Sequence, residues 1–168
     1  MRISELDGQR VAIWGYGREG RAALAALRWR LPGRPLTVFC KDDEVAELKA
    51  QEDPTLVIRT DADAASLSTF DVIIKSPGIS AYASPKVDAE LHGVRFTSGT
   101  AIWFAENAGA HCVCVTGTKG KSTVTALVAF LLRAAGERTA LAGNIGLPLL
   151  ELLDVQPPPD AWAIELSS

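Results

Sequence analysis

Short apolar runs alternate with longer segments of helical periodicity along most of the chain. Arg10–Trp14 is an apolar run of strand length, and Arg21–Leu31 has helical spacing before Pro32-Gly33 ends it. This alternation is typical of an α/β fold with a mostly parallel sheet. Further strands are predicted at Pro35–Cys40, Leu56–Arg59, Phe70–Lys75, Val94–Thr97, His111–Thr116, Ala140–Ala142 and Trp162–Leu166. Further helices are predicted at Asp43–Glu52, Ser84–Leu91, Ala101–Asn107, Lys121–Ala135 and near Leu147–Leu153.

Three of these segments carry more specific predictions. Ser84-Pro85 predicts an N-cap followed by proline at the first helical position. His111–Thr116 is predicted to be a buried strand. The helix from Lys121 is apolar on nearly all sides, which predicts that protein covers it until Gly136 ends it in a left-handed conformation.

The chain is predicted to hold two domains, residues 1–98 and 99–168, divided at Ser98-Gly99-Thr100. Its last residues lie at the end of the strand Ala161–Leu166. A strand of a parallel sheet should continue into a crossover connection. We therefore expect the chain to be part of a longer protein, with the second domain cut short.

The composition of the chain argues against nucleic-acid binding and membrane insertion. With 48% apolar residues, 22% charged residues and a net charge of −3, the chain is typical of a globular protein, without bulk attraction for nucleic acid or anionic lipid. No run reaches the 18 uncharged apolar residues of a membrane span. Cys40, Cys112 and Cys114 form no zinc-ligand spacing, which favours a reducing, cytoplasmic location. The pair Cys112 and Cys114 is predicted to be small core residues.

The loop Gly15-Tyr16-Gly17-Arg18-Glu19-Gly20 matches G-x-G-x-x-G between a predicted strand and helix. Its first glycine permits a tight turn, its second admits a pyrophosphate, and its third allows close helix–strand packing. A dinucleotide site also needs an acid at the end of the second strand, where this chain has Cys40. A nucleotide or nucleotide-sugar site is therefore favoured over NAD, and a loop that serves packing alone is the other possibility.

The strongest signal is the segment Val115-Thr116-Gly117-Thr118-Lys119-Gly120-Lys121-Ser122-Thr123, a variant phosphate loop between a strand and a long helix. Backbone N–H groups of such a loop converge on phosphates, while Lys121 reaches the terminal phosphate and Ser122 binds Mg²⁺. Glu165 ends a neighbouring parallel strand, so it is predicted to share that crevice and to supply a carboxylate for Mg²⁺. The alternative for Glu165 is a solvent-facing residue at a strand end.

Together these motifs resemble the Mur ligase family, ATP-dependent amide-forming enzymes of bacterial peptidoglycan synthesis. The resemblance rests on the phosphate loop, Gly143-Asn144-Ile145-Gly146-Leu147-Pro148, Glu165-Leu166-Ser167-Ser168, Ser76-Pro77-Gly78-Ile79 and the N-terminal glycine loop. The last two look like those of the branch that adds glutamate to UDP-N-acetylmuramoyl-L-alanine. The resemblance implies a Rossmann-like UDP-substrate-binding domain followed by the first part of a P-loop ATPase domain.

The resemblance also implies a role for individual residues. ATP would be bound by Gly117, Thr118, Lys119, Gly120, Lys121, Ser122 and Thr123. The UDP-sugar would contact Gly17, Arg18, Glu19, Lys41, Asp42, Ser76, Gly78, Asn144 and Ser167. Lys121 and Glu165 would be catalytic, and Ser122 and Glu165 would hold Mg²⁺. Two positions depart from the family pattern: Cys40 stands where an acid is common, and Lys119 where asparagine is common.

The implied reaction uses ATP and Mg²⁺ to join UDP-N-acetylmuramoyl-L-alanine to glutamate through an acyl phosphate. The implied partner is the C-terminal remainder of the same protein, without which this chain is expected to be inactive. Neither nucleic acid binding nor membrane insertion is expected. Two alternatives stay open, a nicotinamide-dependent oxidoreductase and a non-catalytic nucleotide-binding module. The configuration of the added amino acid is left open, as is the oligomeric state.

Overall fold

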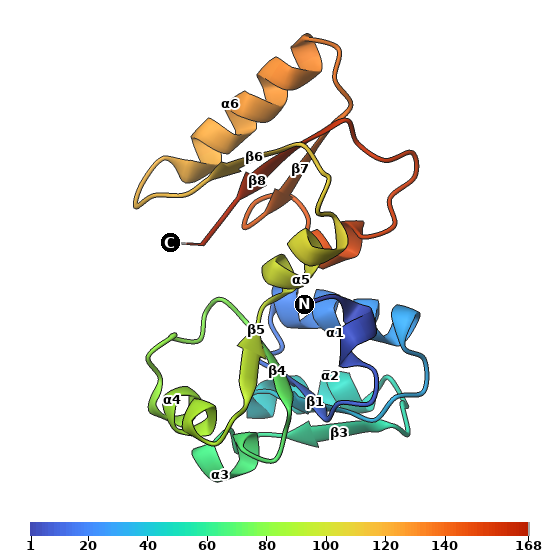
Figure 1. Ribbon diagram of the computed structural model, residues 1–168, viewed down its shortest axis with the longest axis vertical. Helices are drawn as coiled ribbons and strands as arrows, with labels where there is room; N and C mark the ends of the chain where they lie inside the picture. Colours follow the sequence, from blue (N-terminus) through green and yellow to red (C-terminus); the bar gives the residue numbers. More distant parts are fainter. Residues whose placement is uncertain (168) are drawn as a thin grey trace. The chain divides into compact units, whose positions relative to one another are not determined.

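The computed structural model describes residues 1–167 and forms two compact units, one of Met1–Ile102 and one beginning at Trp103 (Figure 1). The division falls within helix α5 (Gly99–Glu106), slightly after the predicted boundary at Ser98. Ser168 of the predicted Glu165–Ser168 motif lies outside the described residues.

The first unit contains a five-stranded parallel sheet in the order β3-β2-β1-β4-β5 (Figure 1). Its strands are β1 (Val11–Trp14), β2 (Leu36–Phe39), β3 (Leu56–Arg59), β4 (Val72–Lys75) and β5 (Arg95–Thr97). β1 lies at the centre, between β2 and β4, and its first three residues are fully buried. The predicted α/β fold with parallel strands is confirmed.

Helices cover both faces of this sheet. They are α1 (Arg18–Arg30), α2 (Val45–Lys49), α3 (Ala64–Leu67) and α4 (Ser84–Leu91), with short 3₁₀ segments η1 (Ile3–Leu6) and η2 (Asp42–Glu44). Leu67 of α3 and Ala89 of α4 belong to one buried cluster with Ala12 and Ile73 of the sheet. α1 and α2 pack on the opposite face, as expected for right-handed crossovers in this strand order.

Three local predictions for this unit were wrong. α1 begins at Arg18, because Gly17 is already its N-cap. The segment predicted as one helix from Asp43 is a 3₁₀ turn followed by the short α2, which ends at Lys49. Ser84 is the first helical residue and not the cap, since its hydroxyl donates to Asp88 (3.0 Å) and Ala83 occupies the cap position.

The second unit contains a three-stranded parallel sheet in the order β6-β8-β7 (Figure 1). Its strands are β6 (Cys112–Val115), β7 (Thr139–Gly143) and β8 (Ala161–Glu165). α6 (Lys121–Ala134) packs on the sheet through Thr125 and Ala129, and a 3₁₀ segment η3 covers Leu149–Leu152. The ring of Trp162 in β8 meets that of Trp103 at 4.6 Å between centroids. Every residue of the central strand β8 is buried.

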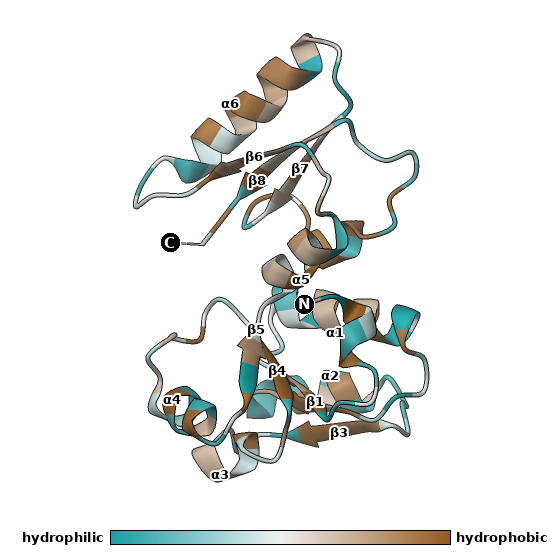
Figure 2. Ribbon diagram, viewed as in Figure 1, coloured by the Kyte–Doolittle hydropathy of each residue, from teal (hydrophilic) through white to brown (hydrophobic). Residues whose placement is uncertain are grey.

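The predictions that β6 is buried and that α6 is covered were wrong for the described residues. β6 pairs on one side only, so Val113 and Cys114 are exposed and Cys112 is half-buried. Cys114 is therefore not a core residue. The outer side of α6 exposes Val124, Leu127, Phe130 and Leu131, and Figure 2 shows the apolar colouring along this helix.

Candidate functional site

The predicted residues of the first unit come together at the carboxyl ends of three neighbouring parallel strands. Gly17 follows the central strand β1, Lys41 follows β2, and Ser76 and Gly78 follow β4. In open parallel sheets ligands bind in the crevice at this edge. The strand order therefore places the candidate contacts on both sides of the glycine loop.

The glycines of the loop have distinct physical roles. Gly15 has a φ of +93°, and a β-carbon there would lie 2.9 Å from Ser76. A β-carbon on Gly20 would lie 2.0 Å from the Gly15 carbonyl oxygen, so only glycine lets α1 start this close to β1. A β-carbon on Gly17 would meet nothing within 4 Å. The loop is thus closed on the protein side and open at Gly17, at the N-terminus of α1.

Tyr16 anchors the glycine loop to α1 and α2. Its side chain is buried, its hydroxyl accepts a hydrogen bond from Gln51 (2.6 Å), and the guanidinium of Arg21 lies 4.6 Å from its ring centroid. Arg21 in turn forms a bidentate ion pair with Glu47 of α2 (2.8 and 2.6 Å). Burial is the main cause that raises the pKa of Tyr16. These contacts fix the loop relative to the helix that follows Lys41 and Asp42.

The end of β2 presents a neutral thiol followed by an acidic segment. Cys40 is buried, and its burial, with the nearby carboxylates of Glu44, Asp42 and Asp43, raises the pKa of its thiol. Lys41 and Asp42 are exposed. The Lys41 amide donates to the Glu44 carboxylate (2.9 Å), which closes the turn at the start of η2.

The turn after β4 is joined directly to the glycine loop. The Ser76 hydroxyl donates to the Gly15 carbonyl (2.9 Å), and the Ser76 amide donates to the Trp14 carbonyl (2.9 Å). Gly78 is exposed beside them. The hydroxyl of Ser76 is thus engaged within the protein, whereas the backbone of Gly78 is exposed.

In the second unit, the predicted phosphate loop connects β6 to α6. Gly117 and Gly120 have φ values of +142° and +75°, and a β-carbon on either would meet nothing within 4 Å. Gly120 is the N-cap of α6, so Lys121 and Ser122 open the helix. The Lys121 ammonium donates to the Gly117 carbonyl (2.5 Å) and thereby spans the loop. Thr118, Lys119, Ser122 and Thr123 are exposed.

Glu165 is buried at the end of the central strand β8. It pairs in register with Val115 of β6 and Gly143 of β7, and Val115 directly precedes the residues of the phosphate loop. Its side chain is 5% exposed, and Oε2 has no hydrogen-bond partner among the described residues. A buried carboxylate oxygen without a partner is costly unless a cation or donor satisfies it. The alternative of a solvent-facing Glu165 is wrong.

Asn144 and Ser167 lie beside each other at the same edge of this sheet. The Ser167 hydroxyl donates to Asn144 Oδ1 (3.1 Å), and the Asn144 amide donates to the Glu165 carbonyl (3.0 Å). Gly146 makes the turn after β7 possible, because a β-carbon there would lie 2.3 Å from the Leu141 carbonyl oxygen. Both polar side chains are exposed.

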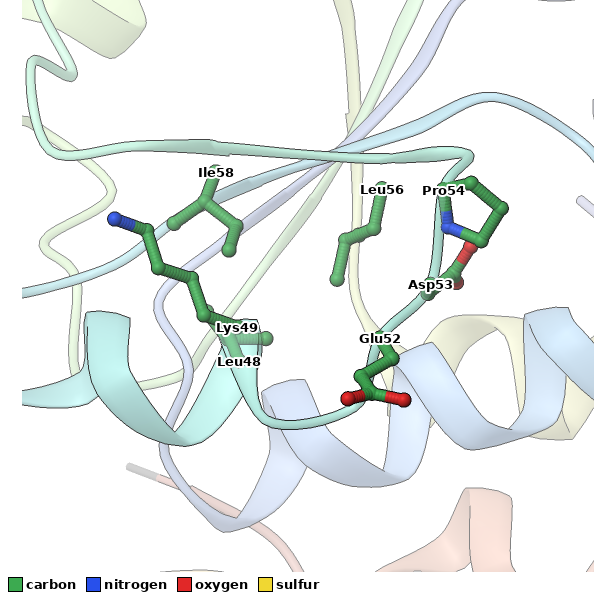
Figure 3. A pocket seen from close by; sticks show the side chains of 7 residues that line it. All are labelled: Leu48, Lys49, Glu52, Asp53, Pro54, Leu56 and Ile58. Atoms are coloured by element: carbon green, nitrogen blue, oxygen red, sulfur yellow. The ribbon is translucent and has the colours of Figure 1, made fainter.

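One hollow of the first unit is separate from the predicted sites. It has a volume of about 390 Å³ and lies between α2 and the edge strand β3, where Figure 3 shows Lys49 and Glu52 at its rim and Leu56 and Ile58 on its wall. None of its lining residues belongs to the predicted sites. Among residues 1–167 no group of three or more His, Cys, Asp or Glu side chains is arranged to hold a metal ion. Within the same range no helix is long and apolar enough to cross a membrane.

The chain matches curated proteins over its whole length. It is 58% identical to the UDP-N-acetylmuramoyl-L-alanine--L-glutamate ligases of Xanthomonas campestris pv. campestris and of Xylella fastidiosa, and 39% identical to that of Salinispora tropica. In each case the match covers all of this chain and 37% of the relative. The chain is thus similar, over its whole length, to ligases that carry this name.

The chain spans just over a third of the length of the relatives that it matches. No protein-family model matches it. The crystal structure of the UDP-N-acetylmuramate:L-alanyl-gamma-D-glutamyl-meso-diaminopimelate ligase from Neisseria meningitides superposes with a TM-score of 0.50 at 23% identity. That superposition covers 94% of this chain and 52% of the other, and it supports the fold.

Sequence reasoning missed the roles of two residues near the candidate site of the first unit, Tyr16 and Lys75. Tyr16 occupies a variable position of the glycine motif, so no pattern signalled its contacts with Gln51 and Arg21. Lys75 is the last residue of a predicted strand, a position where a lysine is expected to be solvated. Its ammonium instead donates to two backbone carbonyls. The role of Tyr16 depends on a contact with a residue distant in sequence, Gln51, and the role of Lys75 depends on a turn that folds back onto its side chain.

Proposed function

We propose that this chain provides the nucleotide-substrate and ATP-binding parts of an ATP-dependent amide ligase that joins glutamate to UDP-N-acetylmuramoyl-L-alanine. The observation that carries the proposal is the register of Glu165 with Val115, which sets a buried, unpartnered carboxylate beside the start of a phosphate loop. The names of the relatives support the substrate, and they specify L-glutamate as the amino acid.

In the second unit we assign ATP to Gly117, Thr118, Lys119, Gly120, Lys121, Ser122 and Thr123. Open glycines at the helix N-terminus leave backbone amides accessible to phosphates. The Lys121 ammonium donates a hydrogen bond to the Gly117 carbonyl in this structure. When ATP binds, it would donate to a phosphate oxygen instead. Its charge would offset the repulsion between two anionic reactants, the substrate carboxylate and the triphosphate.

The residues also fit a magnesium ion. The unpartnered Oε2 of Glu165 is the kind of hard, anionic oxygen that Mg²⁺ prefers. Ser122 lies in the first turn of α6 and would supply a second oxygen ligand, its hydroxyl. Mg²⁺ held by Glu165 and Ser122 would neutralise charge on the phosphate oxygens of ATP.

In the first unit we assign the UDP part of the substrate to Gly17, Arg18, Glu19, Lys41, Asp42, Ser76 and Gly78. These residues surround the N-terminus of α1 at the carboxyl edge of the sheet. Asn144 and Ser167 of the second unit stay predicted contacts to the sugar nucleotide. The neutral Cys40 thiol would stand where relatives of this branch commonly carry an acid, so the base would meet a weak donor in place of a carboxylate.

The proposed reaction has two balanced steps. The substrate carboxylate attacks the γ-phosphorus of ATP, which forms an acyl phosphate and releases ADP. The amino group of glutamate then attacks the acyl carbon, phosphate leaves, and the nitrogen loses a proton to the released phosphate or to water as the amide forms. Lys121 would hold the triphosphate in line, and the phosphate loop would exclude water from it.

We further propose that additional polypeptide completes the second unit, as in relatives of which this chain covers 37%. The support is physical: α6 exposes Leu127, Phe130 and Leu131, and the edge strand β6 exposes Val113. Contiguous exposed apolar side chains of this kind mark a surface that other protein covers. By itself the chain would bind nucleotides without ligase activity.

Nucleotide titrations test the proposal on the chain itself. We expect UDP and MgATP to bind, and NADH not to bind, because the end of β2 lacks the acid that a nicotinamide site needs. A longer form of the protein that includes the region found in relatives should then release ADP only in the presence of both UDP-N-acetylmuramoyl-L-alanine and glutamate. Parallel assays with L- and D-glutamate decide the acceptor. Binding of NADH with no binding of UDP would favour the oxidoreductase alternative, and nucleotide binding with no ligation by the longer form would favour a non-catalytic module.

Lys121→Ala in the longer form should reduce the rate of ADP release by orders of magnitude, because a phosphate-loop lysine acts on charge that develops during transfer. Lys119→Asn is the matched control. Lys119 is an exposed residue of the same loop, and we expect its substitution to change the rate far less. A near-normal rate for Lys121→Ala would contradict the assignment of the loop.

A further inference from the structure

Lys75 bridges the two ends of the turn that follows β4. Its side chain is half-buried, and its ammonium donates to the carbonyls of Ser76 (3.1 Å) and Ile79 (2.6 Å). The turn is also closed by a hydrogen bond from the Ile79 amide to the Ser76 carbonyl (3.2 Å). One cation therefore holds the first and the last carbonyl of the Ser76–Ile79 turn.

No carboxylate pairs with Lys75 within the described part of the chain. The charged group that acts on it is Lys86 of α4, which is itself paired with Glu90 (2.5 Å). Burial and, to a smaller extent, the charge of Lys86 lower the pKa of Lys75. A partly desolvated cation without a counter-ion is unfavourable, so carbonyl dipoles of the turn are its stabilising partners.

This arrangement sets the direction of the amides in the turn. In a planar trans peptide the C=O and the next N–H point in opposite directions. Because the Ile79 carbonyl faces Lys75, the Ser80 N–H points away from it. Neither the Gly78 nor the Ser80 N–H donates to an acceptor among residues 1–167. The turn thus keeps its carbonyls on the lysine and leaves amide groups available to an anion.

The same turn is locked to the glycine loop. The Ser76 hydroxyl donates to the Gly15 carbonyl (2.9 Å), and a β-carbon on Gly15 would lie 3.3 Å from Cδ1 of Ile79. A shift of the turn would therefore disturb these contacts with the glycine loop, which contains the N-cap of α1, Gly17. The ammonium of Lys75 acts on a rigid assembly of turn and loop.

We propose that Lys75 is a positioning residue for the diphosphate of the nucleotide substrate, bracing the Ser76–Ile79 turn so that the turn and the glycine loop present their amides together. It does so without touching the ligand. The inference rests on the proposed function, because it deepens the assignment of the UDP group to this edge of the sheet.

Calorimetric titration of the 168-residue chain with UDP and with uridine tests this role. Lys75→Met should weaken UDP binding about tenfold, equivalent to about 1.4 kcal/mol, while uridine binding changes less than about twofold. Lys75→Arg, which keeps a cationic donor, should restore most of the UDP affinity. Lys86→Met is the matched control on α4, and its affinities should stay close to those of the parent chain. Thermal melting of each variant reports whether it is folded, and Lys75→Gln replaces Lys75→Met if the latter does not fold.

The outcomes separate the two proposals. If the parent chain binds UDP and Lys75→Met binds it equally well, the positioning role is wrong and the proposed function stands. A parallel loss of UDP and uridine affinity, or no recovery in Lys75→Arg, would show a packing role and also overturn the inference. If the parent chain binds neither ligand, the assignment of UDP to this unit fails, and the role of Lys75 fails with it.

Discussion

A β-carbon on Gly143 would lie 2.3 Å from the carbonyl oxygen of Glu165. The last residues of β7 and β8 approach this closely because Gly143 has a φ of +96° and no side chain. The same approach lets the Asn144 amide donate to the Glu165 carbonyl (3.0 Å). The backbone that carries the proposed metal ligand is therefore held by a glycine in the neighbouring strand.

Gly143→Ala should destabilise the second unit by about 1–3 kcal/mol, since alanine is strained at this φ and collides with backbone. Denaturant unfolding of the chain measures the change. Gly136→Ala is a matched control, because its φ is +93° but a β-carbon there would meet nothing within 4 Å. We expect Gly143→Ala to lower the free energy of unfolding clearly more than Gly136→Ala does. Equal losses would mean that the contact with Glu165 adds nothing to the cost of the left-handed backbone.

Two glycines of the N-terminal loop should respond differently to alanine. Gly20→Ala places a β-carbon 2.0 Å from the Gly15 carbonyl and should lower the melting temperature of the first unit as well as its UDP affinity. Gly17→Ala has open space and an ordinary φ of −68°, so it should leave the melting temperature nearly unchanged and weaken UDP binding alone. Calorimetric titration combined with thermal melting checks both. A stable Gly17→Ala variant with full UDP affinity would place the ligand elsewhere.

An aspartate and an arginine join neighbouring strands at the amino edge of each sheet. Asp71, just before β4, accepts from the Arg10 amide (2.7 Å) and side chain (2.6 Å), which lowers the pKa of Asp71 from 3.8 to about 2. Asp160 makes the corresponding contacts with Arg138 before β7, and its pKa is also lowered to about 2. A depressed folded-state pKa stabilises the fold above the ordinary value of 3.8, and the contribution is lost as the pH falls through about 2.

Melting temperatures should therefore fall between about pH 4 and pH 2. Asp71→Asn should lower the melting temperature of the first unit near neutral pH and flatten its acid dependence. Asp160→Asn should do the same for the second unit. Melting curves recorded across this pH range decide the point, and an unchanged acid dependence in both variants would assign the acid sensitivity to other carboxylates.

The cysteines should differ in their reactivity with iodoacetamide at neutral pH. Cys40 is buried, and the acidic groups around it raise the pKa of its thiol beyond the effect of burial, so we expect slow alkylation. Cys114 is exposed on the edge strand β6 and should react first. Peptide mapping by mass spectrometry after short exposure gives the order. If UDP binds near Cys40, saturating UDP should slow its alkylation further and leave Cys114 unaffected.

A substitution on the exposed apolar side of α6 should have different effects in the 168-residue chain and in a longer form of the protein. Phe130→Gln should be neutral or improve solubility in the 168-residue chain, where the side chain is 65% exposed. In a longer form that covers this helix, the same substitution should destabilise by about 2–4 kcal/mol, because a buried aromatic ring is lost and an amide is buried. Denaturant unfolding of both forms measures the difference. Equal stability changes in the two forms would show that α6 stays exposed.

Local sequence patterns were enough to predict the α/β class, the succession of strands along the chain and both glycine-rich loops. Apolar runs and glycine spacing are local signals, and the loops of Gly15 and Gly117 follow strands as predicted. Glu165 was predicted to lie near the phosphate loop because neighbouring parallel strands end at the same edge of a sheet, and β8 does pair with β6. Family resemblance then added the expected ligand contacts, which the binding experiments test.

Which of these side chains are buried, and what they contact, depends on the tertiary structure. Glu165 is buried because β8 is the central strand of its sheet. The strand β6 and the outer side of α6 are apolar in sequence, yet they are exposed because nothing in the described part of the chain packs on them. The roles of Tyr16, Ser76 and Lys75 depend on hydrogen bonds to Gln51, Gly15 and Ile79. Burial and such contacts depend on how distant strands and turns are placed, and a local pattern of polar and apolar residues does not encode that placement.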